Sequence, residues 1–205
     1  MKFSYLSAVA TLAAAAALAG CGGKAQFTVQ GSINGLANNG LVLASGGENL
    51  PVASGATSFA FKRQIDYGTD YLITVQHQPD HMTCAVTSGA SGSAGHNVSI
   101  QAVVSCAQNE YTLGGQFTGL TAAADGTART LVLLNGSAGG SVTISSASAT
   151  AGAGDFVFGS TVADGQAYGV TVLTQPAGLF CTVTNGTGVM HEVAVSNLLV
   201  NCVPQ

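Results

Sequence analysis

Five cysteines are the residues of this 205-residue chain whose chemistry depends most clearly on their position. A cysteine thiol can bind a metal, attack a substrate, accept a lipid or form a disulfide, so its neighbours decide which of these applies. One cysteine, Cys21, ends an apolar N-terminal stretch. The other four form two pairs of similar spacing, Cys84 with Cys106 and Cys181 with Cys202.

Residues 1–21 have the pattern of an export signal. Lys2 supplies a positive charge, an apolar region runs from Phe3 to Leu18, and small residues precede Cys21. Two alternatives are cleavage after Ala17-Leu18-Ala19, which would release a soluble protein, and an uncleaved apolar anchor. Ordinary secretory cleavage would leave Cys21 as an odd thiol in an oxidising compartment, because the other four cysteines pair.

The stretch Leu18-Ala19-Gly20-Cys21 resembles the lipobox of bacterial lipoproteins. This resemblance implies that residues 1–20 are a lipoprotein signal peptide and that Cys21 carries a lipid that anchors the chain to a membrane. Residues 21–26 would then be a lipidated tether, and the five residues after Cys21 span at most ~18 Å. The residue after the cysteine is Gly22, not the Asp that resembles an inner-membrane retention signal, which favours the outer membrane.

A group of potential metal ligands, His77, Asp80, His81 and Cys84, stands close together in the sequence. Pro79 breaks any helix that would bring both histidines to one face. Neither histidine recurs in the second half of the chain, where Thr174 and Gly178 occupy the matching positions. A solvated strand–turn–strand is therefore favoured over a metal or redox site. We expect no metal and no cofactor.

The paired cysteines form no C-x-x-C motif, so metal binding is disfavoured for them as well. In a small exported domain a disulfide is the default state of such a pair. We therefore predict the bridges Cys84–Cys106 and Cys181–Cys202, each inside its own domain.

Catalysis and nucleic-acid binding find no support in the remaining residues. The sequence has no G-x-S-x-G and no phosphate-binding G-x-x-x-x-G-K, and we predict that the protein is not an enzyme. Its net charge is −4, and only four basic residues follow Lys2. Four scattered cations cannot neutralise a phosphate backbone, so nucleic acid is excluded as a partner.

The rest of the sequence consists of two tandem copies of one repeat unit. The order of matching residues never breaks between the two copies, which predicts a duplication with β-sandwich repeats at 27–107 and 111–203. Apolar residues alternate with polar ones, as in half-buried strands, including Val98, Ile100 and Val104 on one face. In the second copy the alternation changes phase, which indicates a bulge near Asn197. The clearest matches are Phe59 and Phe61 with Phe156 and Phe158, Tyr71 with Tyr168, and Gln78-Pro79 with Gln175-Pro176.

In both copies a glycine stands three residues before a tyrosine that opens an apolar strand: Gly68 before Tyr71, and Gly165 before Tyr168. This pattern resembles the tyrosine corner of immunoglobulin-like sandwiches. Together with the preceding Phe-x-Phe strand it also resembles carboxypeptidase-regulatory-like, transthyretin-type repeats of bacterial surface proteins. The resemblance implies an all-β extracytoplasmic protein of two tandem sandwiches and assigns no functional residue.

These observations predict a lipid-anchored envelope protein with a structural, adhesive or partner-binding role and no catalysis. The alternative is a glycan-binding or accessory module of the envelope, although tryptophan is absent. Its partners would be the membrane, through the lipid on Cys21, and an envelope protein or glycan. Segments 121–130 and 137–154 are longer than their counterparts in the first copy, and loops on a rigid sandwich are common recognition sites.

Overall fold

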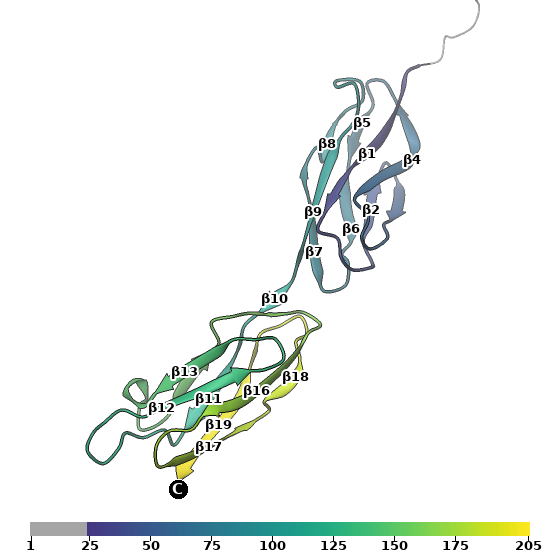
Figure 1. Ribbon diagram of the computed structural model, residues 1–205. Helices are drawn as coiled ribbons and strands as arrows, with labels where there is room; N and C mark the ends of the chain where they lie inside the picture. Colours follow the sequence, from purple (N-terminus) through teal and green to yellow (C-terminus); the bar gives the residue numbers. More distant parts are fainter. Residues whose placement is uncertain (1–23) are drawn as a thin grey trace, which may run out of the picture.

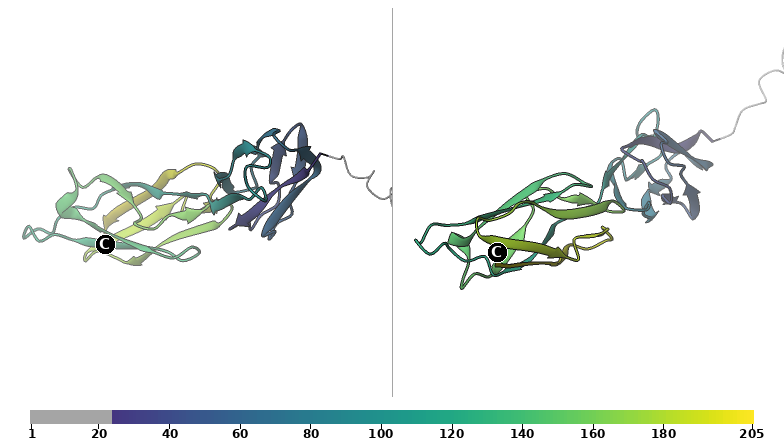
Figure 2. Two further views of the ribbon diagram at one scale, coloured as in Figure 1. Left: turned by 90° about the horizontal axis from the view of Figure 1, so that it is seen from above. Right: turned by 60° about the horizontal axis from the view of Figure 1, so that its bottom comes forward.

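The computed structural model describes residues 24–205, so the signal sequence and Cys21 lie outside the described residues. Two β-sandwiches lie end to end, joined by the short segment that contains β10 (Figure 1). The described chain enters at the far end of the N-terminal sandwich, and the C-terminus lies at the opposite end of the molecule. The views in Figure 2 show the same serial arrangement. No helix among the described residues is long and apolar enough to cross a membrane.

The N-terminal sandwich has two layers. One layer is a four-stranded sheet in the order β4-β1-β9-β7, and the other consists of two smaller sheets, β3-β2-β6 and β5-β8. Strands β1 and β9 run parallel, and the other pairs are antiparallel. Its strands are β1 (Gln26–Asn34), β2 (Val42–Ser45), β3 (Glu48–Pro51), β4 (Ser58–Asp66), β5 (Asp70–Leu72), β6 (Thr74–His77), β7 (Met82–Ser88), β8 (Ser91–Ser93) and β9 (Ala102–Gln108).

The C-terminal sandwich repeats this plan with the sheets β14-β11-β19-β17 and β13-β12-β16-β18. The two-stranded pair β10-β15 continues the first of them, because it matches the opening residues of β1 and the end of β4. Its elements are β10 (Glu110–Tyr111), β11 (Leu113–Thr118), β12 (Thr130–Asn135), β13 (Ser141–Ser145), the 3-10 turn Ser146–Ser148, β14 (Gly154–Val157), β15 (Val162–Ala163), β16 (Ala167–Thr174), β17 (Leu179–Thr184), β18 (Thr187–Val189) and β19 (Val195–Pro204).

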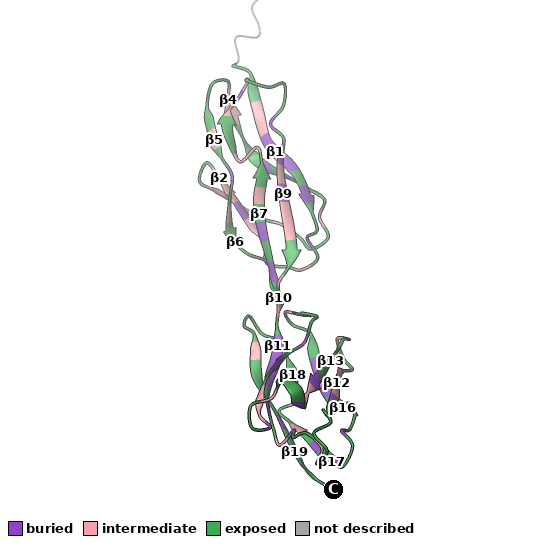
Figure 3. Cartoon of the chain, turned by 90° about the vertical axis from the view of Figure 1, so that its left-hand side faces the viewer, coloured by how far each residue is buried: buried purple, intermediate pink, exposed green. Residues whose placement is uncertain are grey.

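Each sandwich has its own hydrophobic core, and the buried positions alternate with exposed ones along the strands (Figure 3). In β4 the rings of Phe59 and Phe61 meet edge to face at 6.0 Å, and Phe156 and Phe158 repeat this contact at 6.2 Å. One expected core residue is wrong: Val98 is fully exposed, since it lies in an irregular stretch before β9 rather than on the strand.

A repeated glycine allows the first and last strands of each sandwich to run side by side. A Cβ at Gly31 of β1 would collide with the carbonyl oxygen of Ala102 in β9, and one at Gly115 of β11 would collide with that of Leu198 in β19. The bulge predicted near Asn197 is confirmed, because β19 has one residue more than β11 between the pairs Leu113–Val195 and Gly115–Leu198. The fold is all-β, with two tandem sandwiches, as the sequence predicts.

Candidate functional site

The four paired cysteines lie at matching places in the two sandwiches. Cys84 of β7 stands directly opposite Cys106 of β9, with their Cα atoms 4.0 Å apart and a disulfide between them. Cys181 and Cys202 are joined in the same way across β17 and β19, with a Cα separation of 3.9 Å. These are the pairs that the sequence analysis expects, and each bridge fastens the C-terminal strand of its sandwich to a neighbour.

A glutamine holds the strand beside each disulfide, and the sequence analysis did not assign it this role. The Gln78 side chain donates to the carbonyl oxygen of Cys84 at 3.0 Å and accepts from the Cys84 N–H at 2.7 Å. Gln175 makes the same two bonds to Cys181, at 2.9 and 2.8 Å. The signal was present in the sequence, because both glutamines precede a proline and a cysteine at matching positions.

The structure separates the residues of the suspected metal cluster. Cys84 is in a disulfide, the His77 ring lies 2.9 Å from the carbonyl oxygen of Gly40, and His81 turns toward the other sandwich. Residues 24–205 contain no group of three or more His, Cys, Asp or Glu side chains arranged to hold a metal ion. His81 instead lies at the junction between the two sandwiches.

His81 of the N-terminal sandwich contacts Asp164 of the C-terminal one. The His81 Nδ1 atom lies 3.1 Å from Asp164 Oδ2. Asp164 is 3% exposed, and its Oδ1 accepts from the backbone N–H of Glu192 at 2.9 Å. This hydrogen bond from Glu192 lowers the pKa of Asp164 most strongly, and the contact with His81 lowers it further, against the opposing effect of burial. The carboxylate is therefore held in its charged form at the junction.

The connecting segment supports the same contact with main-chain bonds. The backbone N–H of Asn109 donates to the His81 carbonyl at 2.9 Å, and the Asp164 N–H donates to the Asn109 carbonyl at 2.8 Å. The Gln108 side chain adds a bond to the Asp164 carbonyl at 3.0 Å. One short segment thus bonds to a turn of each sandwich, which restricts how the two can move relative to each other.

The duplication shows that the junction pair is a local specialisation. Tyr67 occupies the place of Asp164 in the first copy: its N–H donates to Ala25, as that of Asp164 does to Asn109. Gly178 occupies the place of His81 in the second copy, and both residues have a positive φ, 71° and 60°. Histidine in this conformation costs about 1–2 kcal/mol relative to glycine. Each of the two residues that meet thus differs from its counterpart in the other copy.

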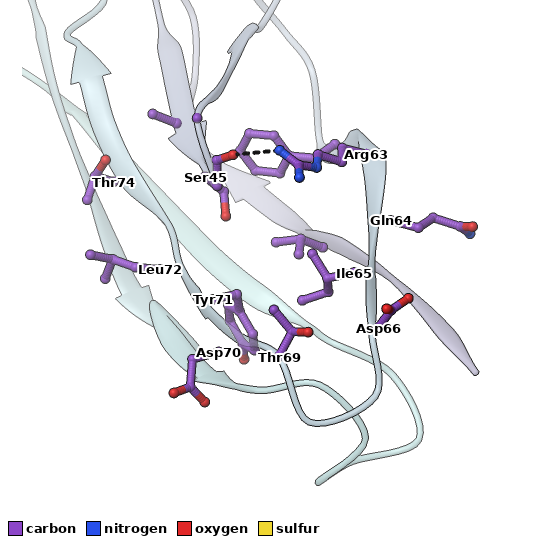
Figure 4. A pocket seen from close by; sticks show the side chains of 15 residues that line it. Ser45, Arg63, Gln64, Ile65, Asp66, Thr69, Asp70, Tyr71, Leu72 and Thr74 are labelled. Atoms are coloured by element: carbon purple, nitrogen blue, oxygen red, sulfur yellow. Dashed lines mark hydrogen bonds between the residues drawn. The ribbon is translucent and has the colours of Figure 1, made fainter. Parts of the chain in front are cut away.

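A pocket of about 800 Å³ opens in the side of the N-terminal sandwich (Figure 4). It lies between the end of β4 and the strands β2, β5 and β6. Its floor is apolar and its rim is polar, and Figure 4 shows Ile65, Thr69 and Tyr71 directed toward the space between the strands. The floor residues are Val29, Phe61, Ile65 and Tyr71, and the rim residues include Ser45, Arg63, Asp66 and Asp70.

One wall of the pocket is fixed by a carboxylate that covers the edge of β4. The Glu48 oxygens accept from the backbone N–H groups of Lys62 and Arg63 at 3.0 and 2.9 Å. These two hydrogen bonds, that from Lys62 first, lower the pKa of Glu48. Arg63 in turn donates to the carbonyl of Gly46 at 3.3 Å. The β2–β3 hairpin is thereby tied to β4 beyond the β2–β6 pairing.

No protein-family model matches the sequence, and no curated protein matches it. Among solved structures, the chain is similar to the TIE protein of Bacillus anthracis, with a TM-score of 0.46, 12% identity and 87% of this chain covered. It spans 34% of that protein's length. The C-terminal fragment of the pilus adhesin SpaC from Lactobacillus rhamnosus GG gives a TM-score of 0.42 and 11% identity, over 88% of this chain and 97% of that fragment. At these values the similarities carry no information about what this chain binds.

Proposed function

We propose that the protein is a lipid-anchored component of a bacterial envelope, attached through Cys21, with a structural, adhesive or partner-binding role and no catalysis. The observation that carries the proposal is the junction. His81, Asp164 and the segment between the sandwiches hold two disulfide-bridged sandwiches in series (Figure 1). Such a chain extends away from its attachment point instead of enclosing an active site.

The attachment end supports the same proposal. The first described residue is Lys24, and Ala25 already bonds to Tyr67 at the outer end of the N-terminal sandwich. A lipid on Cys21 would therefore place that end next to the bilayer and direct the C-terminal sandwich away from it. Disulfides in both sandwiches fit an oxidising compartment outside the cytoplasm. Gly22 after the cysteine favours the outer membrane.

Detergent phase partitioning of the protein expressed in a Gram-negative bacterium tests the anchor. Wild-type protein should enter the detergent phase after processing. Cys21→Ser should lose the lipid and accumulate as unprocessed or soluble protein, because no thiol remains to accept a lipid. Cys84→Ser is a suitable control, since it leaves the N-terminal segment intact. Mature wild-type protein that stayed in the aqueous phase would exclude lipid anchoring.

A further inference from the structure

The pocket of the N-terminal sandwich has a counterpart in the second copy that is closed by the chain itself. Tyr71 matches Tyr168, so Leu72 matches Gly169, and Ser45 of β2 matches Asn135 of β12. The β2–β3 hairpin turns at Gly46-Gly47, whereas the β12–β13 connection has the five residues 136–140. These extra residues pack over Gly169: Ser137 lies against it, and Ala138 contacts the core.

The covering loop also bonds to the strand beneath it. The Asn135 side-chain oxygen accepts from the Gly169 N–H at 2.9 Å, and the Gly136 N–H donates to the Gly169 carbonyl at 2.9 Å. Asn135 is 1% exposed. In the second copy, therefore, both main-chain groups of Gly169 on the side of β12 are satisfied by the segment that fills the space.

In the first copy, the main-chain N–H and C=O of Leu72, which match those of Gly169, face the pocket. On either side of β5 the N–H of Ile73 donates to Ala90 and the carbonyl of Thr69 accepts from Ala94, so residues 69, 71 and 73 direct their main-chain groups toward the β8 segment. Because these groups alternate along a strand, the N–H and C=O of Leu72 point the opposite way. Strand β2 last pairs with β6 at Ala44–Thr74 and does not reach Leu72. Within residues 24–205 no hydrogen-bond partner stands opposite it.

The apolar floor is correspondingly less covered than in the second copy. Leu72 is 58% exposed, and Ile65 and Tyr71 are half-buried. Their counterparts Val162 and Tyr168 are buried. The first copy thus exposes a short strand edge and an apolar floor that the second copy covers with its own chain.

We infer that this pocket is a docking site for a short extended peptide segment of a partner protein. The segment would accept from the Leu72 N–H and donate to the Leu72 carbonyl, and it would place a small apolar side chain on Tyr71 and Ile65. The covering loop of the second copy is the template: an Asn or another short acceptor, followed by glycine and small residues. Main-chain bonds to an open edge with a side-chain pocket beside it are a common mode of peptide recognition.

The covering loop of the second copy is not the occupant, so we assign the pocket to a segment of another protein. The loop at 136–140 is held in the C-terminal sandwich by Asn135 and by its contacts with the core, so it is not free to fill the first pocket. The inference rests on the partner-binding form of the proposed function. The rim carries charges of both signs, Arg63 near Ser45 and Asp66 and Asp70 at the other end of the pocket (Figure 4), which suits an uncharged segment better than a strongly acidic or basic one.

Titration of detergent-solubilised, isotope-labelled protein with the octapeptide of residues 134–141 provides the test. We expect saturable amide shifts at Leu72, Tyr71 and Ile65 with millimolar peptide, and none at Gly169. The same peptide with Ala in place of Asn should bind about fivefold more weakly, since one hydrogen bond is lost. Absence of saturable shifts at Leu72 would overturn the proposal.

Two loop exchanges serve as matched controls. Replacing Gly46-Gly47 by the sequence of residues 136–140, together with Ser45→Asn, should close the pocket and abolish the shifts. Shortening 136–140 to two glycines should open a second site at Gly169 and double the stoichiometry. If the first variant fails to fold, the second still decides, because a peptide that binds elsewhere would keep its stoichiometry.

Other occupants would be recognised in the same experiments. Saturable shifts at Tyr71 with envelope oligosaccharides but not with the peptide would replace the peptide by a glycan. Concentration-dependent shifts at Leu72 without any addition would indicate a second copy of this chain. Either result would overturn the peptide proposal, whereas the lipid anchor is tested separately by the partitioning of Cys21→Ser.

Discussion

Substitution of His81 by glycine, compared with the reverse change at Gly178, should separate the backbone strain at His81 from its contact across the junction. His81 has a φ of 60°, which costs a residue with a side chain about 1–2 kcal/mol. Glycine removes that cost but gives the unfolded chain more freedom, an opposing effect of about 0.4–1 kcal/mol. The intrinsic stability of the N-terminal sandwich should therefore rise by about 0–1.6 kcal/mol.

The contact with Asp164 is lost in the same variant. A hydrogen bond to a charged group contributes about 1.5–3 kcal/mol, but the His81 side chain is 42% exposed, so we expect about 1 kcal/mol. Contact between two domains stabilises whichever unfolds first. In calorimetry of His81→Gly, the first transition should then lie about 4–8 °C below the position that the strain effect alone predicts, and the second should show no such loss.

The repeat supplies a control for this experiment. Gly178 has the same backbone conformation and no Asp164 opposite it, so Gly178→His adds the strain without the contact. That variant should destabilise the C-terminal sandwich by about 0–1.6 kcal/mol, the strain less the reduced freedom of the unfolded chain, and it therefore measures the strain effect without the contact. If the transitions of His81→Gly showed no loss beyond the strain effect that Gly178→His measures, or an equal loss in both, the contact would not couple the sandwiches and the reasoning would be refuted.

Three further predictions follow from individual residues. Folding lowers the pKa of Asp164, so the carboxylate stabilises the protein fully above its ordinary pKa of 3.8, and this contribution is lost as the pH falls through the folded value. The difference in unfolding free energy between wild type and Asp164→Asn should therefore be constant near neutral pH and shrink in acid, as measured by denaturant unfolding at several pH values. A parallel acid dependence in both proteins would contradict the assignment. Gln175→Ala leaves the N–H and C=O of Cys181 without their partner and should cost about 2 kcal/mol in denaturant unfolding, whereas the exposed Gln64→Ala should cost little. Gly115→Ala forces a methyl group against the carbonyl of Leu198 and should destabilise the C-terminal sandwich by at least about 2 kcal/mol, while Gly126→Ala, with open space around its Cα, reports the cost of a positive φ alone.

The loops are where the binding site expected from the sequence differs from the one that the structure supports. The greater length of segment 137–154 in the second copy suggested a recognition loop. In the structure its first residues close a space within their own sandwich, with Ala138 on the core. The open site lies instead in the first copy, where the corresponding hairpin is short. The length of each loop could be predicted from the sequence. Which loop covers the apolar floor of a pocket depends on how the tertiary structure places the strands.

The sequence by itself determined the strands, the duplication and the pairs of cysteines. These follow from local chemistry: alternation decides which side chains face a core, and repeated spacing places matching residues on matching strands. Even the bulge near Asn197 could be predicted, because a change of phase is visible along one strand. Val98 was misplaced, since the alternation in the sequence begins before strand β9 itself does.

Only the tertiary structure decided what His81, Asp164 and Leu72 do. His81 and Asp164 lie 83 positions apart, and neither residue type recurs at the matching place in the other copy, so no periodic pattern relates them. They meet because the end of one sandwich abuts the beginning of the next. Leu72 reads as an ordinary strand residue, and its free edge arises because β2 turns away at Gly46. Contacts between elements distant in the chain depend on where the whole fold places them, and local sequence does not encode that placement.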